Sequence, residues 1–257
     1  PYKGIFGCKI GNTYSQTCKN LGFTLAEVLI TLGIIGVILA LLMPTLIQNH
    51  KKKQTISQLK AAYSTLSQAT SSAKIEHGDI SIWDFGLNNI DFANKYVLPY
   101  LKIVKTVSTT QDKSYWKVYS LENSIFTNWP WDNGNDINEN PIYILSNGSA
   151  ITISHFLDLS MRITVDINGP KGPNVMGIDG FCFHFNKNAN QLMPEFWNTY
   201  DRDTMLDSNN GYACSRETKG SPYYAGTQCA AVIMIDGWQI SKDYPWGNGG
   251  RTPTSKD

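Results

Sequence analysis

The chain has 257 residues, with 22 lysines and arginines against 21 aspartates and glutamates, and a mean hydropathy of −0.25. These averages are those of a soluble protein of one or two domains, yet residues 23–47 form an apolar run whose one ionisable side chain is Glu27. As a helix, these 25 residues are long enough to cross the ~30 Å hydrocarbon core of a bilayer. The run argues against a wholly cytosolic enzyme.

The segment ahead of this run is basic. Residues 1–22 contain Lys3, Lys9 and Lys19 and no acid, so the rest of the chain holds 19 basic and 21 acidic residues, a net charge of −2. That balance does not predict a nucleic-acid-binding surface. The run is longer than the ~7–15 apolar residues of a secretory signal peptide, which leaves a plain signal anchor as the alternative. Because the sequence starts at Pro1 rather than Met, we expect further residues before it.

A short motif stands at the start of the apolar run. Gly22 is followed by Phe23, Glu27 lies five residues beyond the glycine, and the apolar sequence continues to Pro44. Over residues 17–50 this pattern closely resembles the amino-terminal signature of type IV pilins and of type II secretion pseudopilins. The resemblance implies cleavage by a prepilin peptidase between Gly22 and Phe23, and N-methylation of the new amino group on Phe23.

Glu27 is the residue on which assembly is expected to depend. A carboxylate inside hydrocarbon is costly and usually marks a function and a partner. Cleavage creates an α-amino group on Phe23 that is mostly cationic at neutral pH. A neighbouring subunit displaced along the helix axis is expected to offer that amine to Glu27, which fixes the register between subunits. The alternative is that Glu27 only extends to the nearby membrane interface.

Helical periodicity continues beyond the apolar run. Apolar residues recur at steps of three and four at Ile56, Leu59, Tyr63, Leu66, Ala69 or Thr70, and Ala73. Gly78 supplies a stop, so we expect one helix over residues 23–76, about 80 Å long, with a kink favoured at Pro44. The expected organisation is a discarded leader (1–22), a membrane span (23–47), an amphipathic continuation (48–78) and an exported head (79–257).

One charge cluster conflicts with simple topology rules. His50 and the lysines 51–53 follow the span on the side that the cleavage motif places outside, so counting positive charges gives no clear orientation. We expect these lysines to lie against lipid headgroups before assembly or on the inner helices of a filament afterwards. The alternative is a solvated helix face.

The rest of the chain predicts a small antiparallel sheet. Residues 79–114 resemble an irregular connection with short helical pieces, including one at 90–96. Strands are predicted at 115–119, 142–145, 150–154, 161–167 and 181–185, and Asn147-Gly148 favours a hairpin turn between the second and third. A helix followed by such a sheet is an α+β fold, which is also the pilin-like architecture that the amino terminus implies.

Three cysteines remain after the leader is removed. Cys214 and Cys229 bracket a loop rich in glycine, serine and tyrosine, and we expect them to form a disulfide in an oxidising exported head. Such a bond would stabilise the head by ~3 kcal/mol. Cys182 alternates with phenylalanines in a predicted strand and is expected to be a buried free thiol. No cysteine or histidine spacing is typical of a zinc site.

Two further patterns are open to a binding interpretation. Asp166, Asn168 and Asp179 offer oxygen ligands of the kind that hold calcium, although Asx turns explain the same residues. Exposed tryptophans would form a sugar- or protein-binding surface, although aromatic residues in such a head are more often core; these are Trp129, Trp131, Trp238 and Trp246. Residues 165–174, together with 237–238 and 243–246, also resemble the head of a bacterial pilin-like subgroup, which implies fold and no activity.

The expected function is that of a structural subunit of a type IV pilus or a type II secretion pseudopilus. Its partners would be other subunits, the prepilin peptidase, the inner-membrane assembly platform and, before assembly, membrane lipid. The precursor would lie in the bacterial inner membrane with its head exported, and then join a periplasmic pseudopilus or a surface pilus. The alternative is a minor pilin-like binding module for adhesion or DNA uptake. The chain contains none of the common catalytic motifs, so we expect no enzyme and no cofactor, with calcium left open.

Overall fold

The computed structural model describes eight stretches of the chain: residues 23–107, 118–121, 125–126, 141–156, 160–169, 171–197, 199–219 and 224–246. The predicted leader with Gly22, the first part of the strand predicted at 115–119, and Trp129 and Trp131 lie outside them. The chain divides into two units, Pro1–Gln48 and Asn49–Asp257. Helix α1 (Leu25–His77) begins two residues later and ends one residue later than predicted.

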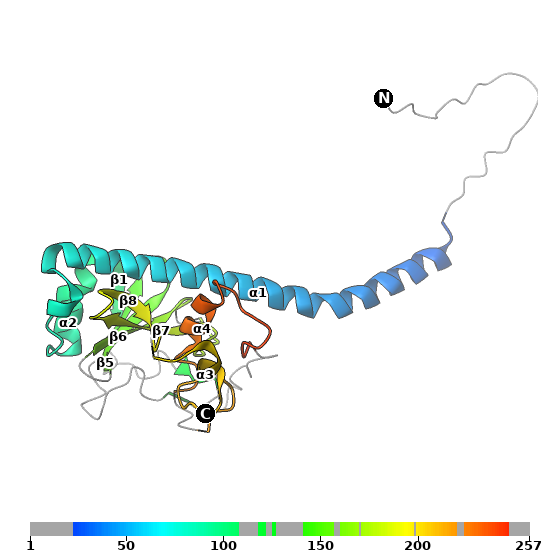
Figure 1. Cartoon of the computed structure of the whole chain (residues 1–257). Coiled ribbons are helices and arrows are strands. Elements are labelled where there is room, and N and C mark those ends of the chain that lie inside the picture. The colour runs from blue at the N-terminus through cyan, green and yellow to red at the C-terminus, as the bar shows by residue number, and fades with distance from the viewer. Residues whose placement is uncertain are drawn as a thin grey trace, which may run out of the picture. The chain divides into compact units, whose positions relative to one another are not determined.

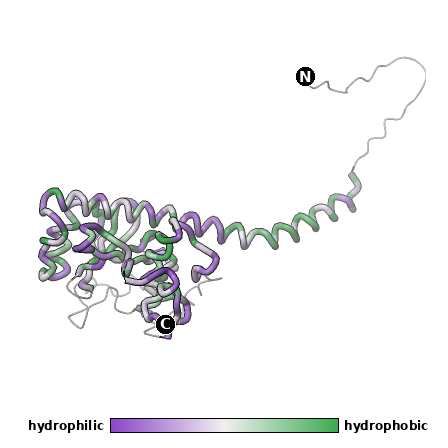
Figure 2. The backbone as a smooth tube through the Cα atoms, viewed as in Figure 1, coloured by the Kyte–Doolittle hydropathy of each residue, from purple (hydrophilic) through white to green (hydrophobic). Residues whose placement is uncertain are grey.

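The first unit consists, in its described part, of the apolar half of α1. Every residue from 23 to 47 is exposed in the isolated chain, including Phe23 at 87% and Leu41 at 72%. Figure 2 shows this part of the helix as mainly hydrophobic beyond its amino-terminal end. By length and composition α1 is able to cross a membrane. Pro44 lies inside the helix, and the expected kink there stays a prediction.

The second unit begins with the amphipathic half of α1, which lies alongside the sheet (Figure 1). Its buried residues recur at helical spacing and confirm the predicted stripe: Thr55, Leu59, Ala62, Leu66, Ala69, Thr70 and Ala73. Ile56 and Tyr63 are partly buried against the same core. Gly78 ends the helix with a φ of +75°, which favours glycine, and its N–H donates to the Lys74 carbonyl at 2.9 Å.

A compact connection follows α1. It contains two short 3-10 helices, η1 (Ile80–Ile82) and η2 (Leu98–Tyr100), and helix α2 (Asn89–Tyr96) between them, which confirms the helix predicted at 90–96. Asn88 caps α2 by accepting the Asp91 N–H at 2.8 Å. Aromatic side chains pack this region onto the sheet, with Trp83 stacked on Tyr96 at 4.6 Å between ring centroids.

The main sheet is antiparallel and has six strands in the order β1-β4-β5-β6-β7-β8. They are β1 (Ile103–Val107), β4 (Ile142–Leu145), β5 (Ala150–Phe156), β6 (Ser160–Asp166), β7 (Gly180–Asn186) and β8 (Gln191–Pro194). A separate pair is formed by β2 (Val118–Tyr119) and β3 (Ile125–Phe126). The structure therefore confirms an α+β, pilin-like fold and the four strands predicted between 142 and 185.

One prediction for this region was wrong. Residues 103–107 form the strand β1 and not part of an irregular connection. β1 is an edge strand with three exposed residues in succession, so it lacks the alternation by which a half-buried strand is recognised. β8, which no pattern predicted, is a four-residue edge strand that pairs only with β7 among the described strands.

The two faces of the sheet differ in character. Ile163 and Phe183 are paired on the face that packs against α1, where the Phe183 ring lies 5.4 Å from that of Tyr63. The opposite face carries polar side chains that are nonetheless buried, among them Thr152, Ser154 and Arg162. Two short helices, α3 (Arg202–Leu206) and α4 (Cys229–Ile235), complete the described chain.

Candidate functional site

The start of α1 is organised by Thr24 and Glu27. The Thr24 N–H and hydroxyl donate to Glu27 Oε2 at 2.8 and 2.9 Å. In return the Glu27 N–H donates to Thr24 Oγ1 at 3.2 Å. This reciprocal arrangement is a capping box, which satisfies backbone N–H groups that the first helical turn leaves without partners.

The capping box gives Glu27 a role within its own chain. Its carboxylate is bonded to Thr24 and does not simply extend away from the helix. The expected pairing with the amine of a neighbouring Phe23 stays a prediction, and it would require exchange of these hydrogen bonds. The sequence reasoning missed Thr24, although Thr-x-x-Glu before an apolar run is a recognised sign of a helix start.

The predicted disulfide between Cys214 and Cys229 is confirmed. Both residues are almost fully buried, and the bond ties the start of α4 to the loop after α3 across 15 residues. Gly177 is required beside it, since its φ is +77° and an added Cβ would lie 2.5 Å from Cys229 Sγ. Cys182 is the buried free thiol expected. Burial raises its pKa to about 12, which keeps it protonated and unreactive.

The three calcium candidates lie together in the turns between β6 and β7. Asp166 accepts the Asn168 N–H at 3.1 Å. Asp179 accepts the N–H groups of Asn174 and Val175 at 2.8 and 2.5 Å, and the Asn168 side-chain amide at 3.2 Å. The bond from Asn168 to Asp166 is an Asx turn, which was the alternative to a metal site. The bonds to Asp179 instead join the preceding loop to its carboxylate. Within the described stretches, no three His, Cys, Asp or Glu side chains gather as metal ligands.

A buried ion pair lies on the polar face of the sheet. Arg162 on β6 bonds to Glu195, which follows β8, and their side chains are 4% and 0% exposed. Burial raises the pKa of Glu195, and the Arg162 guanidinium opposes that shift. His184 on β7 lies opposite Arg162 in the sheet. Burial, and then the Arg162 charge, lowers the His184 pKa to about 4, so the imidazole is neutral at pH 7.

Sequence reasoning missed this cluster. Alternating polar residues in a strand normally indicate a solvated face, and Arg162 follows that alternation. Only the tertiary structure reveals that the face is covered.

A second charged network fixes the end of the described chain. Arg202 on α3 donates to Asp236 at 2.5 and 2.9 Å and to Asp243 at 2.8 and 2.9 Å. These hydrogen bonds hold the pKa values of both carboxyls below their ordinary range. Ser241 joins the same network by donating to Asp236 at 2.7 Å. The network attaches the segment after α4 to α3, which is a structural role.

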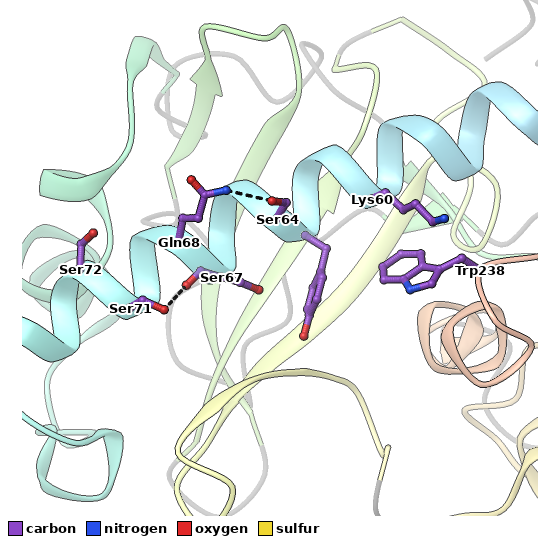
Figure 3. Close-up of a pocket in the computed structure, with 8 residues that line it drawn as sticks. Lys60, Ser64, Ser67, Gln68, Ser71, Ser72 and Trp238 are labelled. Atoms are coloured by element: carbon purple, nitrogen blue, oxygen red, sulfur yellow. Dashed lines mark hydrogen bonds between the residues drawn. The ribbon is translucent and has the colours of Figure 1, made fainter.

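An open groove runs along the exposed side of the amphipathic half of α1 (Figure 3). It has a volume of about 720 Å³ and is lined by Lys60, Tyr63, Ser64, Ser67, Gln68, Ser71, Ser72 and Trp238. The Lys60 ammonium lies 5.6 Å from the centre of the Trp238 ring. Trp238 adopts a left-handed backbone with a φ of +64°, which is unusual for a bulky residue. Trp238 and Trp246 both pack against the core, and Trp238 also lines the groove.

Comparisons with known proteins divide the chain into two matched regions. A prokaryotic N-terminal methylation motif matches residues 18–43, the part that contains the capping box. A family described as a family of unknown function, DUF6613, matches residues 45–247. No curated protein and no solved structure matches the chain.

Proposed function

Because the chain belongs to DUF6613, a family of unknown function, and carries a prokaryotic N-terminal methylation motif, we propose that it is a structural subunit of a type IV pilus or a type II secretion pseudopilus. The motif itself implies processing by a prepilin peptidase and assembly with pilin-like subunits. It also implies a precursor anchored in the inner membrane with an exported head. Pilin-like families are generally not enzymes.

The proposal extends to individual residues. The peptidase cuts between Gly22 and Phe23, and Phe23 is then N-methylated. Residues 1–22 are the discarded leader, 23–47 the membrane span, 48–78 the amphipathic continuation and 79–257 the head. The inner-membrane assembly platform extracts the subunit from lipid into the growing filament.

The observation that carries the proposal is the exposed apolar half of α1. All 25 residues from 23 to 47 are exposed in the isolated chain, and such a surface has to be covered by lipid or by other proteins. A membrane covers it before assembly, and copies of the same helix cover it in a filament. The capping box keeps the Glu27 carboxylate hydrogen-bonded in the stored subunit until a neighbouring amine replaces Thr24 as its partner.

A second function, a minor pilin-like binding module for adhesion or DNA uptake, is favoured by the groove beside Trp238. The two functions predict different amounts of the chain in filaments. Filaments purified from the cell surface or, for a pseudopilus, from the periplasm should contain the chain as their main component if it is the structural subunit. A chain present at only trace level relative to another pilin would support the binding module, and its absence from all filament fractions would refute both.

A further inference from the structure

Three lysines form a positively charged collar around α1. Lys51, Lys52 and Lys53, which we call the lysine collar, are consecutive residues inside the helix. Lys51 and Lys53 are exposed and Lys52 is half-buried. Successive helical residues are rotated by about 100°, so the three side chains are distributed over about 200° of the helix circumference. A solvated face would place its charges at steps of three and four instead.

The collar has no counter-charge nearby on its own helix. The sequence from Val28 to Ile75 contains no acidic residue. Among the described residues, the ion pairs involve Arg162 and Arg202 and none of the collar lysines. Residues 54–257 hold 16 basic and 20 acidic side chains, a net charge of −4. Positive charge is therefore concentrated at the collar while the remainder of the exported part is acidic.

The distance from the end of the apolar run to the lysine collar is similar to the thickness of the lipid headgroup region. Lys51 and Lys53 come four and six residues after Ile47, which corresponds to about 6 and 9 Å along a helix. The headgroup region on each side of a bilayer is roughly 5–8 Å thick. In Figure 2 the tube of α1 changes from hydrophobic to hydrophilic where the apolar run ends. A span that ends near Ile47 would place the collar ammonium groups among lipid phosphates.

We propose that the lysine collar binds the headgroups of anionic phospholipids on the exported side of the membrane while the subunit is stored there. The inference rests on the proposed function, since it requires the apolar run to be a membrane span. Each lysine near an anionic membrane surface raises the association constant for that surface about fivefold. Salt screens the attraction. The collar thereby holds the span at a fixed depth, and extraction into a filament has to release these contacts.

The experiment measures which lipids remain with the protein. The full chain is reconstituted into phosphatidylcholine vesicles that contain a minority of phosphatidylglycerol, then isolated in polymer-bounded lipid discs, and both lipids are quantified by mass spectrometry. The test variant is Lys51→Gln/Lys52→Gln/Lys53→Gln. The matched control, Lys102→Gln/Lys171→Gln/Lys242→Gln, removes three exposed lysines from other parts of the described chain and changes the net charge equally.

We expect the wild-type chain and the control variant to enrich phosphatidylglycerol severalfold over the bulk ratio, and high salt to reduce the enrichment. In discs that hold the collar variant, the ratio of phosphatidylglycerol to phosphatidylcholine should equal that of the bulk vesicles. Equal enrichment in the collar variant, or an equal loss in the control, would overturn the proposal. Flotation with pure phosphatidylcholine vesicles separates the two levels of failure. If the wild-type chain does not float, the membrane-anchored function itself fails; if it floats without enrichment, only the collar proposal fails.

Discussion

Two substitutions at the start of α1 separate the two roles of Glu27. Glu27→Gln retains an oxygen that accepts the Thr24 N–H, because glutamine also serves in a capping box, but it removes the negative charge. Thr24→Ala retains the charge and removes the hydroxyl that bonds Glu27 Oε2 at 2.9 Å and accepts the Glu27 N–H at 3.2 Å. One variant therefore loses the charge and the other loses most of the cap.

The expected effects differ in size. Loss of the Thr24 hydroxyl costs about 1 kcal/mol, as for other N-cap substitutions, which corresponds to roughly a fivefold change in an equilibrium. Removing one partner of a desolvated charge pair is far more damaging because the other charge stays unpaired. If Glu27 pairs with the Phe23 amine of a neighbouring subunit, Glu27→Gln should lower filament incorporation on the order of a hundredfold or more.

The assay compares purified surface or periplasmic filament with the cellular pool by immunoblot, and mass spectrometry of the pool verifies processing. We expect Thr24→Ala filaments at a reduced yield, and almost none from Glu27→Gln. Glu27→Leu, which removes both roles, should be processed normally and not incorporated. Wild-type yield from Glu27→Gln would refute the charge pairing. A reduced yield from Thr24→Ala together with a wild-type yield from Glu27→Gln would mean that Glu27 acts as a cap alone.

Two further predictions concern the head. Replacing both Cys214 and Cys229 by alanine should lower the free energy of unfolding, measured by chemical denaturation, by about 3 kcal/mol, because the bond closes a 15-residue separation. Peptide mapping of the unreduced chain should find Cys182 as a thiol, and a disulfide that includes Cys182 would contradict the assigned pairing. Burial lowers the pKa of His184 from 6.5 in the unfolded chain to about 4 in the folded chain. As the pH falls, the imidazole is therefore protonated in the unfolded chain before it is protonated in the folded chain. This difference removes up to about 3 kcal/mol of the free energy of unfolding between pH 6.5 and pH 4. His184→Gln should flatten that part of the pH profile, and an unchanged slope would count against a neutral buried imidazole.

The elements that the sequence predicted well are those whose pattern repeats. Leu59, Leu66 and Ala73 mark the buried side of α1 through helical spacing, and Gly78 marks its end. The central strands contain β-branched and aromatic residues in alternation. The disulfide between Cys214 and Cys229 could be predicted from the sequence because the two cysteines bracket one loop. In each case the local sequence carries the signal.

The elements that were missed depend on distant parts of the chain. β1 is half-exposed and becomes a strand through its pairing with β4, whose residues Ile142–Leu145 lie far along the sequence. The partner of Arg162 is Glu195, 33 residues away, and no local sequence pattern predicts that contact. Thr24 is a different case, since its capping signature is local and was available. The groove beside Trp238 requires α1 and the segment after α4 to meet, which periodicity alone does not specify.

The amino terminus of the protein extracted from membranes tests the central claim most directly. Intact-mass measurement and amino-terminal sequencing should find a chain that begins at Phe23, lacks residues 1–22 and carries one added methyl group on its α-amine. Deletion of the prepilin peptidase should return the longer, unmethylated form. A chain that begins elsewhere, or one that keeps its leader in the presence of the peptidase, would contradict the account.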